Sequence, residues 1–170
     1  LDDYVLDIEN FIKGLNLGSV YIVAHSFGAR VALKLAYKTN TVEKLVLTGA
    51  AGVKPKRTIG YYLKVFSYKL SKKLFKKWSF KGFGSSDYKK LNGIEKQSFV
   101  YIVNEHLNEI LPFINVKTLI ISGDKDTETP PYEQKRLCKG LKNSKLIFLK
   151  GEGHFAFISS SSEFNYLTRE

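Results

Sequence analysis

The chain has 170 residues, a formal net charge of +11 and 44% hydrophobic residues, which is the composition of one globular domain. Its single cysteine, Cys138, excludes an intrachain disulfide and favours a cytoplasmic location. No run of about 18 apolar residues is present, so the composition also excludes a membrane-spanning helix.

The first element expected along the chain is a helix close to the N-terminus. Apolar Val5, Leu6, Ile8, Phe11 and Ile12 recur there at helical spacing, and the sequence contains no methionine. We therefore expect the chain to be a piece of a longer protein that begins upstream of Leu1.

The next two elements are a strand and a helix joined by a very short turn. Residues 20–24 are β-branched and aromatic, as in a strand buried on both faces, and residues 27–37 have a helical pattern. Ser26 stands at the reversal between them, where a chain that turns within about one residue is strained. Its flanking positions must be small, and Ala24 and Gly28 meet that requirement. The alternative is an ordinary tight turn in which a serine caps the helix.

A strongly basic segment follows the strand predicted at 44–48. Residues 54–90 hold twelve basic side chains and one acid, so this segment accounts for the whole net charge. Within it, residues 59–78 form a cationic amphipathic pattern and residues 82–86 a glycine- and serine-rich hinge, and residues 99–111, after it, are expected to form a returning helix. We expect a lid with solvated lysines or, as a second interpretation, one attracted to an anionic membrane or lipid surface. No nucleic acid is expected as a partner, because no recognised binding motif accompanies the charge.

Two later strands, at 117–122 and 145–149, are each followed by residues that can serve a nucleophile. Asp124 and Asp126 come after the first strand, and His154 lies in a glycine-flanked loop after the second. A serine hydroxyl needs a base that is oriented by a third group. The carboxyl ends of parallel strands converge on one crevice, so Ser26, one of the aspartates and His154 are expected to meet there.

These motifs, in this order and spacing, resemble the α/β-hydrolase superfamily over the entire chain. The resemblance implies a three-layer α/β fold with a mostly parallel sheet, helices on both faces and a helical cap insertion. It implies that Ser26 is the nucleophile, His154 the base, Asp126 the acid and the Phe27 N–H one oxyanion-hole donor. Asp124 is then a turn or solvent-facing carboxylate. The chain departs from the commonest family pattern at Ala24, which stands where a glycine is usual.

The resemblance also suggests how the chain is divided. Residues 1–53 and 113–170 would form the core, and residues 54–112 the cap. The second oxyanion-hole donor would lie upstream of this sequence, so we expect the 170 residues alone to be inactive. The strand at 20–24 would then have an unpaired apolar edge, which predicts poor solubility.

The remaining candidate residues are expected to be structural. His25 would support the elbow together with Ala24 and Gly28, His106 would be a packing or surface residue of a helix, and Cys138 a small core residue. Their spacing suggests no metal site, and no cofactor is expected.

The sequence thus predicts a serine hydrolase that cleaves a small apolar ester or related acyl substrate through an acyl-enzyme. The alternatives are a C–C bond hydrolase or peptidase of the same fold, and a non-catalytic relative that binds a ligand or a partner.

Overall fold

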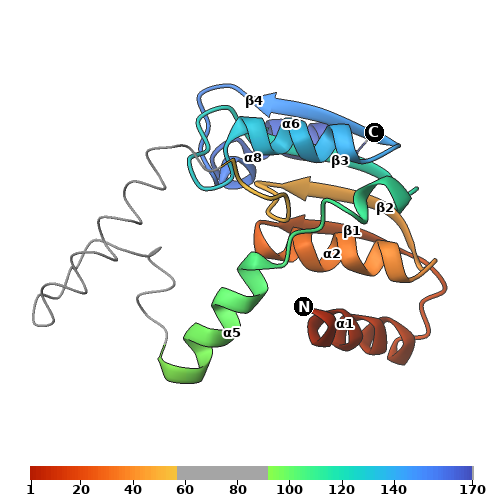
Figure 1. Ribbon diagram of the computed structural model, residues 1–170. Coiled ribbons are helices and arrows are strands. Elements are labelled where there is room, and N and C mark those ends of the chain that lie inside the picture. The colour runs from red at the N-terminus through yellow and green to blue at the C-terminus, as the bar shows by residue number, and fades with distance from the viewer. Residues whose placement is uncertain (57–91, 170) are drawn as a thin grey trace, which may run out of the picture. The chain divides into compact units, whose positions relative to one another are not determined.

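The computed structural model describes residues 1–56 and 92–169 (Figure 1). The strands are β1 (Val20–His25), β2 (Val42–Thr48), β3 (Lys117–Gly123) and β4 (Ser144–Leu149). The helices are α1 (Asp2–Gly14), α2 (Phe27–Lys38), α5 (Gly93–Asn104), the 3₁₀ helix η1 (Leu111–Phe113), α6 (Pro131–Gly140), α7 (Ala156–Ser159) and α8 (Ser161–Thr168).

The four described strands form one sheet in the order β1-β2-β3-β4, and every neighbouring pair is parallel. Leu47 of β2 pairs with Ala24 of β1 on one side and with Ile120 of β3 on the other. The predicted strands agree with these bounds to within two residues, because each is a short run rich in apolar residues. All four carboxyl ends therefore lie at the same edge of the sheet.

Helices cover the two faces of this sheet. Helices α2 and α6 lie on one face, where Leu33, Leu35 and Leu137 are fully buried (Figure 1). Helices α7 and α8 cover part of the other face, where Ala156 and Phe164 pack with buried sheet residues. This arrangement confirms the predicted three-layer α/β architecture with a parallel sheet.

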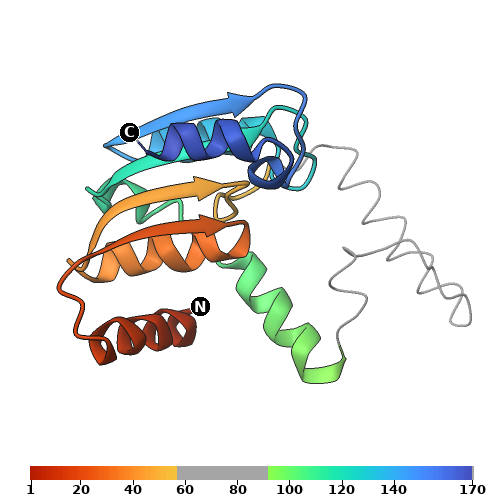
Figure 2. The same ribbon diagram turned by 180° about the vertical axis from the view of Figure 1, so that it is seen from behind.

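The prediction that β1 is buried on both faces is wrong. Tyr21 and Val23 are 66% and 62% exposed, whereas Ala24 is buried. The reason is that α8 lies over β3 and β4, while the same face of β1 stays uncovered by the described elements (Figure 2). A groove of about 650 Å³ runs over this face, from Tyr21 and Val23 to Leu119 and Leu167. As expected, β1 is an edge strand of the described sheet.

The helix predicted over 99–111 is offset from the observed one, because α5 ends at Asn104. The buried guanidinium of Arg30 donates hydrogen bonds to the carbonyls of Val103 and Glu105. The Leu107 N–H donates to the carbonyl of Gly52. These contacts hold the chain against the core in a non-helical path up to η1. His106 therefore lies outside a helix, contrary to the prediction.

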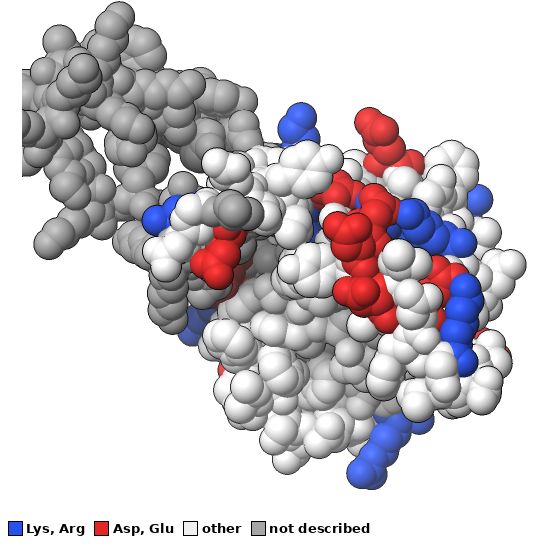
Figure 3. All heavy atoms as spheres, turned by 90° about the horizontal axis from the view of Figure 1, so that it is seen from below, with Lys and Arg blue, Asp and Glu red and all other residues white. Residues whose placement is uncertain are grey.

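The chain forms two compact units, one of residues Leu1–Lys54 with Val103–Glu170 and one of residues Pro55–Ile102. The amphipathic helix predicted at 59–78 and the hinge at 82–86 lie outside the described residues, as do most of the basic side chains of 54–90. Outside that segment the formal charges balance, and Figure 3 shows acidic and basic side chains beside one another on the described surface. No helix in the described part of the chain is long and apolar enough to cross a membrane.

Candidate active site

Ser26 stands at the reversal between β1 and α2, in a backbone conformation that is rare for a residue with a side chain. Its φ is 50° and its ψ is −111°. The Ser26 N–H donates to the carbonyl of Thr48, and its carbonyl accepts from the Ala29 and Ala51 N–H groups. These contacts from both sides hold the strained residue in place. The strain predicted from the sequence is confirmed.

Ala24 and Gly28 lie close together on either side of the elbow. A Cβ atom placed on Gly28 would be 3.8 Å from the Cβ of Ala24, which is an ordinary van der Waals contact. Both small residues pack at this crossing, and the space would admit an alanine at position 28. The contact thus agrees with the expectation that small residues flank Ser26, and it does not require glycine at position 28.

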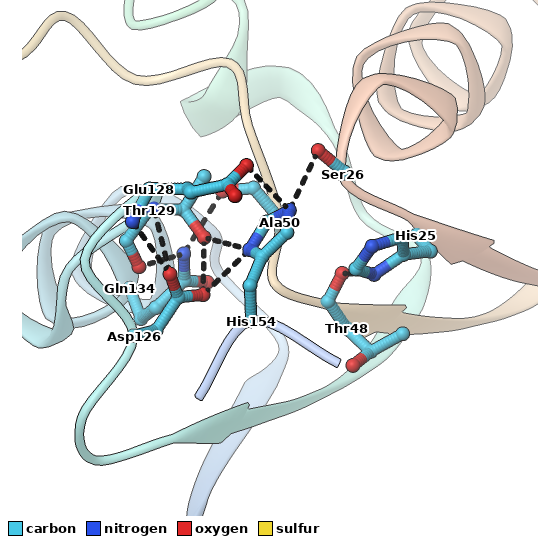
Figure 4. Close-up of polar contacts among 9 residues, drawn as sticks. All are labelled: His25, Ser26, Thr48, Ala50, Asp126, Glu128, Thr129, Gln134 and His154. Atoms are coloured by element: carbon cyan, nitrogen blue, oxygen red, sulfur yellow. Dashed lines mark hydrogen bonds and ion pairs between the residues drawn. The ribbon is translucent and has the colours of Figure 1, made fainter. Parts of the chain in front are cut away.

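The imidazole of His154 lies between the side chains of Ser26 and Asp126 (Figure 4). Its Nε2 is 3.1 Å from Oγ of Ser26, and its Nδ1 is 2.8 Å from Oδ2 of Asp126. The His154 side chain is 7% exposed and that of Asp126 is fully buried. An ionised carboxylate only accepts hydrogen bonds, so Nδ1 donates to Asp126, and in the neutral imidazole the lone pair of Nε2 faces the Ser26 hydroxyl.

Asp126 is held by a dense set of donors. Its Oδ1 accepts from the N–H groups of Glu128 and Thr129 at 2.8 and 2.9 Å, and its Oδ2 accepts from the Thr129 hydroxyl at 2.8 Å. Burial by itself would raise the pKa of Asp126, but the hydrogen bonds from His154, Thr129 and Glu128 outweigh it, so the pKa lies below its usual value. The carboxylate is therefore ionised at neutral pH.

The other candidate acid, Asp124, serves a turn. Its Oδ1 accepts a hydrogen bond from the Gly151 N–H at 2.7 Å. This bond ties the loop after β3 to the loop that carries His154, as the expected role in a turn requires. The structure thus brings Asp126, and not Asp124, to the histidine.

His25 packs directly behind the base. Its ring centroid is 4.6 Å from that of His154, and Phe155 and Phe157 lie against it as well. Its Nδ1 is 3.0 Å from the carbonyl of Thr48, which can only accept, so Nδ1 carries the proton. Burial, followed by the charge of His154, lowers the pKa of His25. A neutral His25 thus forms one wall of the site, consistent with its expected supporting role.

Gly49 closes the site from the carboxyl end of β2. Its φ is +49°, and a Cβ atom placed there would lie 2.9 Å from Nδ1 of His154 and 3.1 Å from Cε1 of His25. Both the backbone conformation and the close approach of the two imidazoles therefore require glycine. Sequence reasoning did not single this residue out, although a glycine directly after a strand is a recognisable signal.

Three further polar residues at the site were also missed. Thr129 is hydrogen-bonded to Asp126, while the Nε2 of buried Gln134 donates to the carbonyls of Ala50 and Thr129 at 2.9 and 3.2 Å. Gln134 thereby ties the loop of the acid to the loop after β2. Glu128 places Oε2 3.5 Å from Nε2 of His154, and its side chain is 64% exposed. These contacts depend on how loops meet, which no sequence spacing reveals.

The remaining candidates lie apart from this hydrogen-bond chain. His106 is in the segment between α5 and η1, and Cys138 is a free thiol on α6 whose Sγ is 3.3 Å from the Ser144 hydroxyl. Phe27 begins α2, where backbone N–H groups have no acceptor within the helix and can bind a developing negative charge. Within residues 1–56 and 92–169, no three His, Cys, Asp or Glu side chains are grouped as metal ligands would be.

This arrangement can move a proton from the Ser26 hydroxyl to Nε2 of His154 while Asp126 holds the ring and compensates its positive charge. Ser26, His154 and Asp126 come from the loops after β1, β4 and β3, which meet at one edge of the sheet. This is the geometry of an activated serine nucleophile.

Comparisons with known proteins point to the same class. A family model described as TAP-like protein, which is an α/β-hydrolase family, matches residues 103–167. No curated protein sequence is significantly similar to the chain.

Solved structures of α/β hydrolases superpose on nearly the whole chain. An esterase from Exiguobacterium antarcticum has a TM-score of 0.70 at 26% identity, over 96% of this chain and 70% of the esterase. A meta-cleavage product hydrolase from Pseudomonas fluorescens has a TM-score of 0.70 at 21% identity, over 98% of this chain and 69% of its own. An α/β hydrolase from a sediment metagenome of the Mar Chica lagoon in Morocco has a TM-score of 0.70 at 22% identity, with coverages of 97% and 66%. The chain therefore spans about two thirds of the length of these structures.

Proposed function

The chain belongs to the α/β-hydrolase superfamily by its fold, and from that premise we propose that the protein is a serine hydrolase that cleaves an ester or related acyl compound. The supporting observation is that one imidazole, that of His154, contacts the Ser26 hydroxyl with one nitrogen and the Asp126 carboxylate with the other. A protein that only binds a ligand does not need a histidine hydrogen-bonded to both a strained serine and a buried aspartate. The arrangement therefore favours a catalytic role over a binding role.

In the proposed acylation step, Ser26 Oγ attacks the carbonyl carbon of the substrate while its proton passes to Nε2 of His154. The carbonyl π electrons move to the oxygen, and the Phe27 N–H stabilises the resulting oxyanion. The tetrahedral intermediate then collapses: the bond to the leaving group breaks, and Nε2 returns the proton to the departing oxygen. Throughout, Asp126 holds Nδ1–H and offsets the imidazolium charge.

Deacylation repeats these steps with water as the nucleophile. His154 takes a proton from the water, the hydroxide attacks the acyl carbon, and the Ser26 oxygen leaves and recovers the proton from Nε2. The acid product departs with the added hydroxyl. No group other than substrate and water is needed for the atoms to balance.

We propose a mostly apolar acyl group as the substrate class. The exposed aromatic side chains of Phe155 and Phe27 lie next to His154 and Ser26 in the sequence, and the Phe155 ring centroid is 5.3 Å from that of His154. Such rings favour an alkyl or aryl chain over a strongly hydrated one. The proposed attraction of residues 54–90 to an anionic membrane or lipid surface stays a prediction, since that segment lies mostly outside the described residues.

Labelling by a fluorophosphonate, which reacts with activated serines, tests this function in the full-length protein. We expect stoichiometric labelling of Ser26, found by peptide mass mapping, and its loss in Ser26→Ala. Hydrolysis of short acyl esters should be lost in the same variant. Asp126→Asn and His154→Ala should each lower kcat by roughly three to four orders of magnitude.

The matched control is Ser162→Ala, because Ser162 is an exposed serine on α8, outside the loops that carry Ser26, Asp126 and His154. This variant should be labelled and should turn over like the wild type. A folded full-length protein that is not labelled and does not hydrolyse acyl esters would contradict the proposal and favour a binding role.

A further inference from the structure

Glu128 occupies a position that the proposed chemistry does not use. Its Oε2 is 3.5 Å from Nε2 of His154, the same nitrogen that lies 3.1 Å from the Ser26 hydroxyl. In Figure 4 the Glu128 carboxylate and the Ser26 hydroxyl approach this nitrogen from neighbouring directions. A second carboxylate therefore lies beside the imidazole nitrogen that contacts the Ser26 hydroxyl.

The backbone of Glu128 is fixed, whereas its side chain is open to solvent. Its N–H donates to Asp126 Oδ1 at 2.8 Å, so the position of this residue beside the base is set by the loop of the acid. The side chain itself is 64% exposed. Removing the carboxylate charge should therefore leave the fold and the Asp126 contacts intact.

The charge of this carboxylate has no lysine or arginine partner within 4 Å in the part of the chain that the structure describes; its one ion-pair contact is His154. In the neutral form of His154, whose proton is on Nδ1, Nε2 offers a lone pair and not a donor. A carboxylate makes no favourable contact with a nitrogen lone pair. A positive charge brought into the site would therefore be a favourable partner for Glu128.

Two further carboxylates, those of Asp126 and Glu133, lie near Glu128, and neither is free to pair with a positive charge in the site. Asp126 is fully buried and accepts four hydrogen bonds, while Glu133 on α6 is buried and accepts from the Tyr132 hydroxyl. Glu128 is thus the accessible negative charge beside the nucleophile among these three.

We propose that Glu128 determines substrate specificity by pairing with a cationic group, such as a substituted ammonium, that the substrate carries close to its scissile acyl bond. This inference rests on the proposed hydrolase function and names its substrate class more narrowly: an acyl compound with an apolar part and one positive charge. The substrate cation draws the carboxylate away from Nε2, which leaves this nitrogen to exchange its proton with Ser26 and the leaving group. The same charge repels anionic substrates.

Charge-matched substrate pairs test this inference in the full-length protein. In the first pair the charge is on the leaving group: butyrylcholine is compared with 3,3-dimethylbutyl butyrate, in which a carbon atom replaces the charged nitrogen. In the second pair the charge is on the acyl chain: the 4-nitrophenyl ester of 4-(trimethylammonio)butyrate is compared with that of 5,5-dimethylhexanoate, its uncharged carbon isostere. For at least one pair, kcat/KM of the wild type should favour the cation by about two- to fivefold, as for a partly exposed ion pair.

The variants separate a local contact from a general charge effect. In Glu128→Gln the preference should vanish, and in Glu128→Lys it should reverse in favour of the uncharged ester. The matched control is Glu163→Gln, which removes the same charge from an exposed position on α8 and should keep the preference of the wild type.

The outcomes distinguish failure of this inference from failure of the proposed function. Ester hydrolysis that depends on Ser26 but shows the same charge preference in the wild type and Glu128→Gln would overturn the role of Glu128 alone. Loss of the preference in Glu163→Gln as well would also overturn it, because the effect would then be long-range. A wild type that neither hydrolyses any of the four esters nor reacts with a fluorophosphonate would overturn the proposed function and this inference together.

Discussion

The Thr129 hydroxyl donates a hydrogen bond of 2.8 Å to Oδ2 of Asp126, the same oxygen that receives Nδ1–H of His154. Thr129 is buried, and its own carbonyl accepts from Gln134. The orientation of the acid therefore depends on a threonine three residues further along the chain, in addition to the histidine.

Replacing Thr129 by the nearly isosteric valine should lower kcat by about tenfold, since one hydrogen bond to a charged group is lost while the shape is kept. KM for a neutral ester should change little, because Thr129 acts through Asp126 and does not meet substrate. Thr129→Ser restores the hydroxyl and should recover most of kcat. Steady-state kinetics of the three proteins checks this, and equal kcat in Thr129→Val and wild type would contradict it.

The lowered pKa of Asp126 should make stability depend on pH in the acid range. In an unfolded chain the pKa of an aspartate carboxyl is about 3.9. In the folded protein the pKa of Asp126 is lower, because the hydrogen bonds from His154, Thr129 and Glu128 outweigh the effect of burial. The ionised group thus stabilises the fold above about pH 4, and this contribution is lost as the pH falls through the folded pKa.

Urea unfolding between pH 7 and pH 3 measures this contribution. The difference in free energy of unfolding between wild type and Asp126→Asn should be largest at neutral pH and should shrink as the pH falls. Asp7→Asn, which removes an exposed carboxylate of α1, is the control and should follow the wild-type curve. A wild-type advantage over Asp126→Asn that does not change with pH would contradict the prediction.

The strands, the order of the site residues and the elbow could be predicted because each leaves a local pattern. Short apolar runs mark β1 to β4, and Ser26 between small residues marks the reversal. In a parallel sheet the carboxyl ends share one edge, so Ser26, Asp126 and His154 could be expected to meet there before any contact was known. The assignment of Asp126 over Asp124 came from the family resemblance and not from spacing.

The contacts that complete the site could not be predicted, because they form between loops. Thr129, Gln134 and Glu128 are polar residues in or just after one loop, and nothing in their spacing indicates which of them contacts His154. The end of α5 was misplaced for a similar reason: helical periodicity continues past Asn104, but hydrogen bonds from Arg30 hold the chain in another path. The exposure of β1 depends on what lies over its face, which its own residues do not encode.

Gly49→Ala should reduce activity far more than it reduces stability. The new Cβ would lie 2.9 Å from Nδ1 of His154, so the imidazole must move away from Asp126 or Ser26. A displacement of this size in a base typically lowers kcat by about 100-fold. The positive φ adds a strain of about 1–2 kcal/mol.

Gly151→Ala is the matched control for this prediction. Gly151 also has a positive φ, of 83°, but a Cβ placed there meets nothing within 4 Å. It therefore carries the backbone strain without the contact to the histidine, and its stability should fall while kcat stays near that of the wild type. Equal losses of kcat in the two variants, measured beside thermal unfolding, would contradict the role given to Gly49.

Arg30→Met should destabilise the fold without altering the site chemistry. Buried Arg30 donates to the carbonyls of Val103 and Glu105, at 3.2 and 2.5 Å, and so holds residues 103–105 at the end of α5 against α2. Methionine fills similar space but leaves both carbonyls without these donors, which should cost about 2–4 kcal/mol in urea unfolding. Lys38→Met on the same helix is the control, because its ion pair with Asp2 is exposed and contributes less than about 1 kcal/mol. Equal free energies of unfolding in Arg30→Met and Lys38→Met would contradict the prediction that the Arg30 hydrogen bonds stabilise the fold.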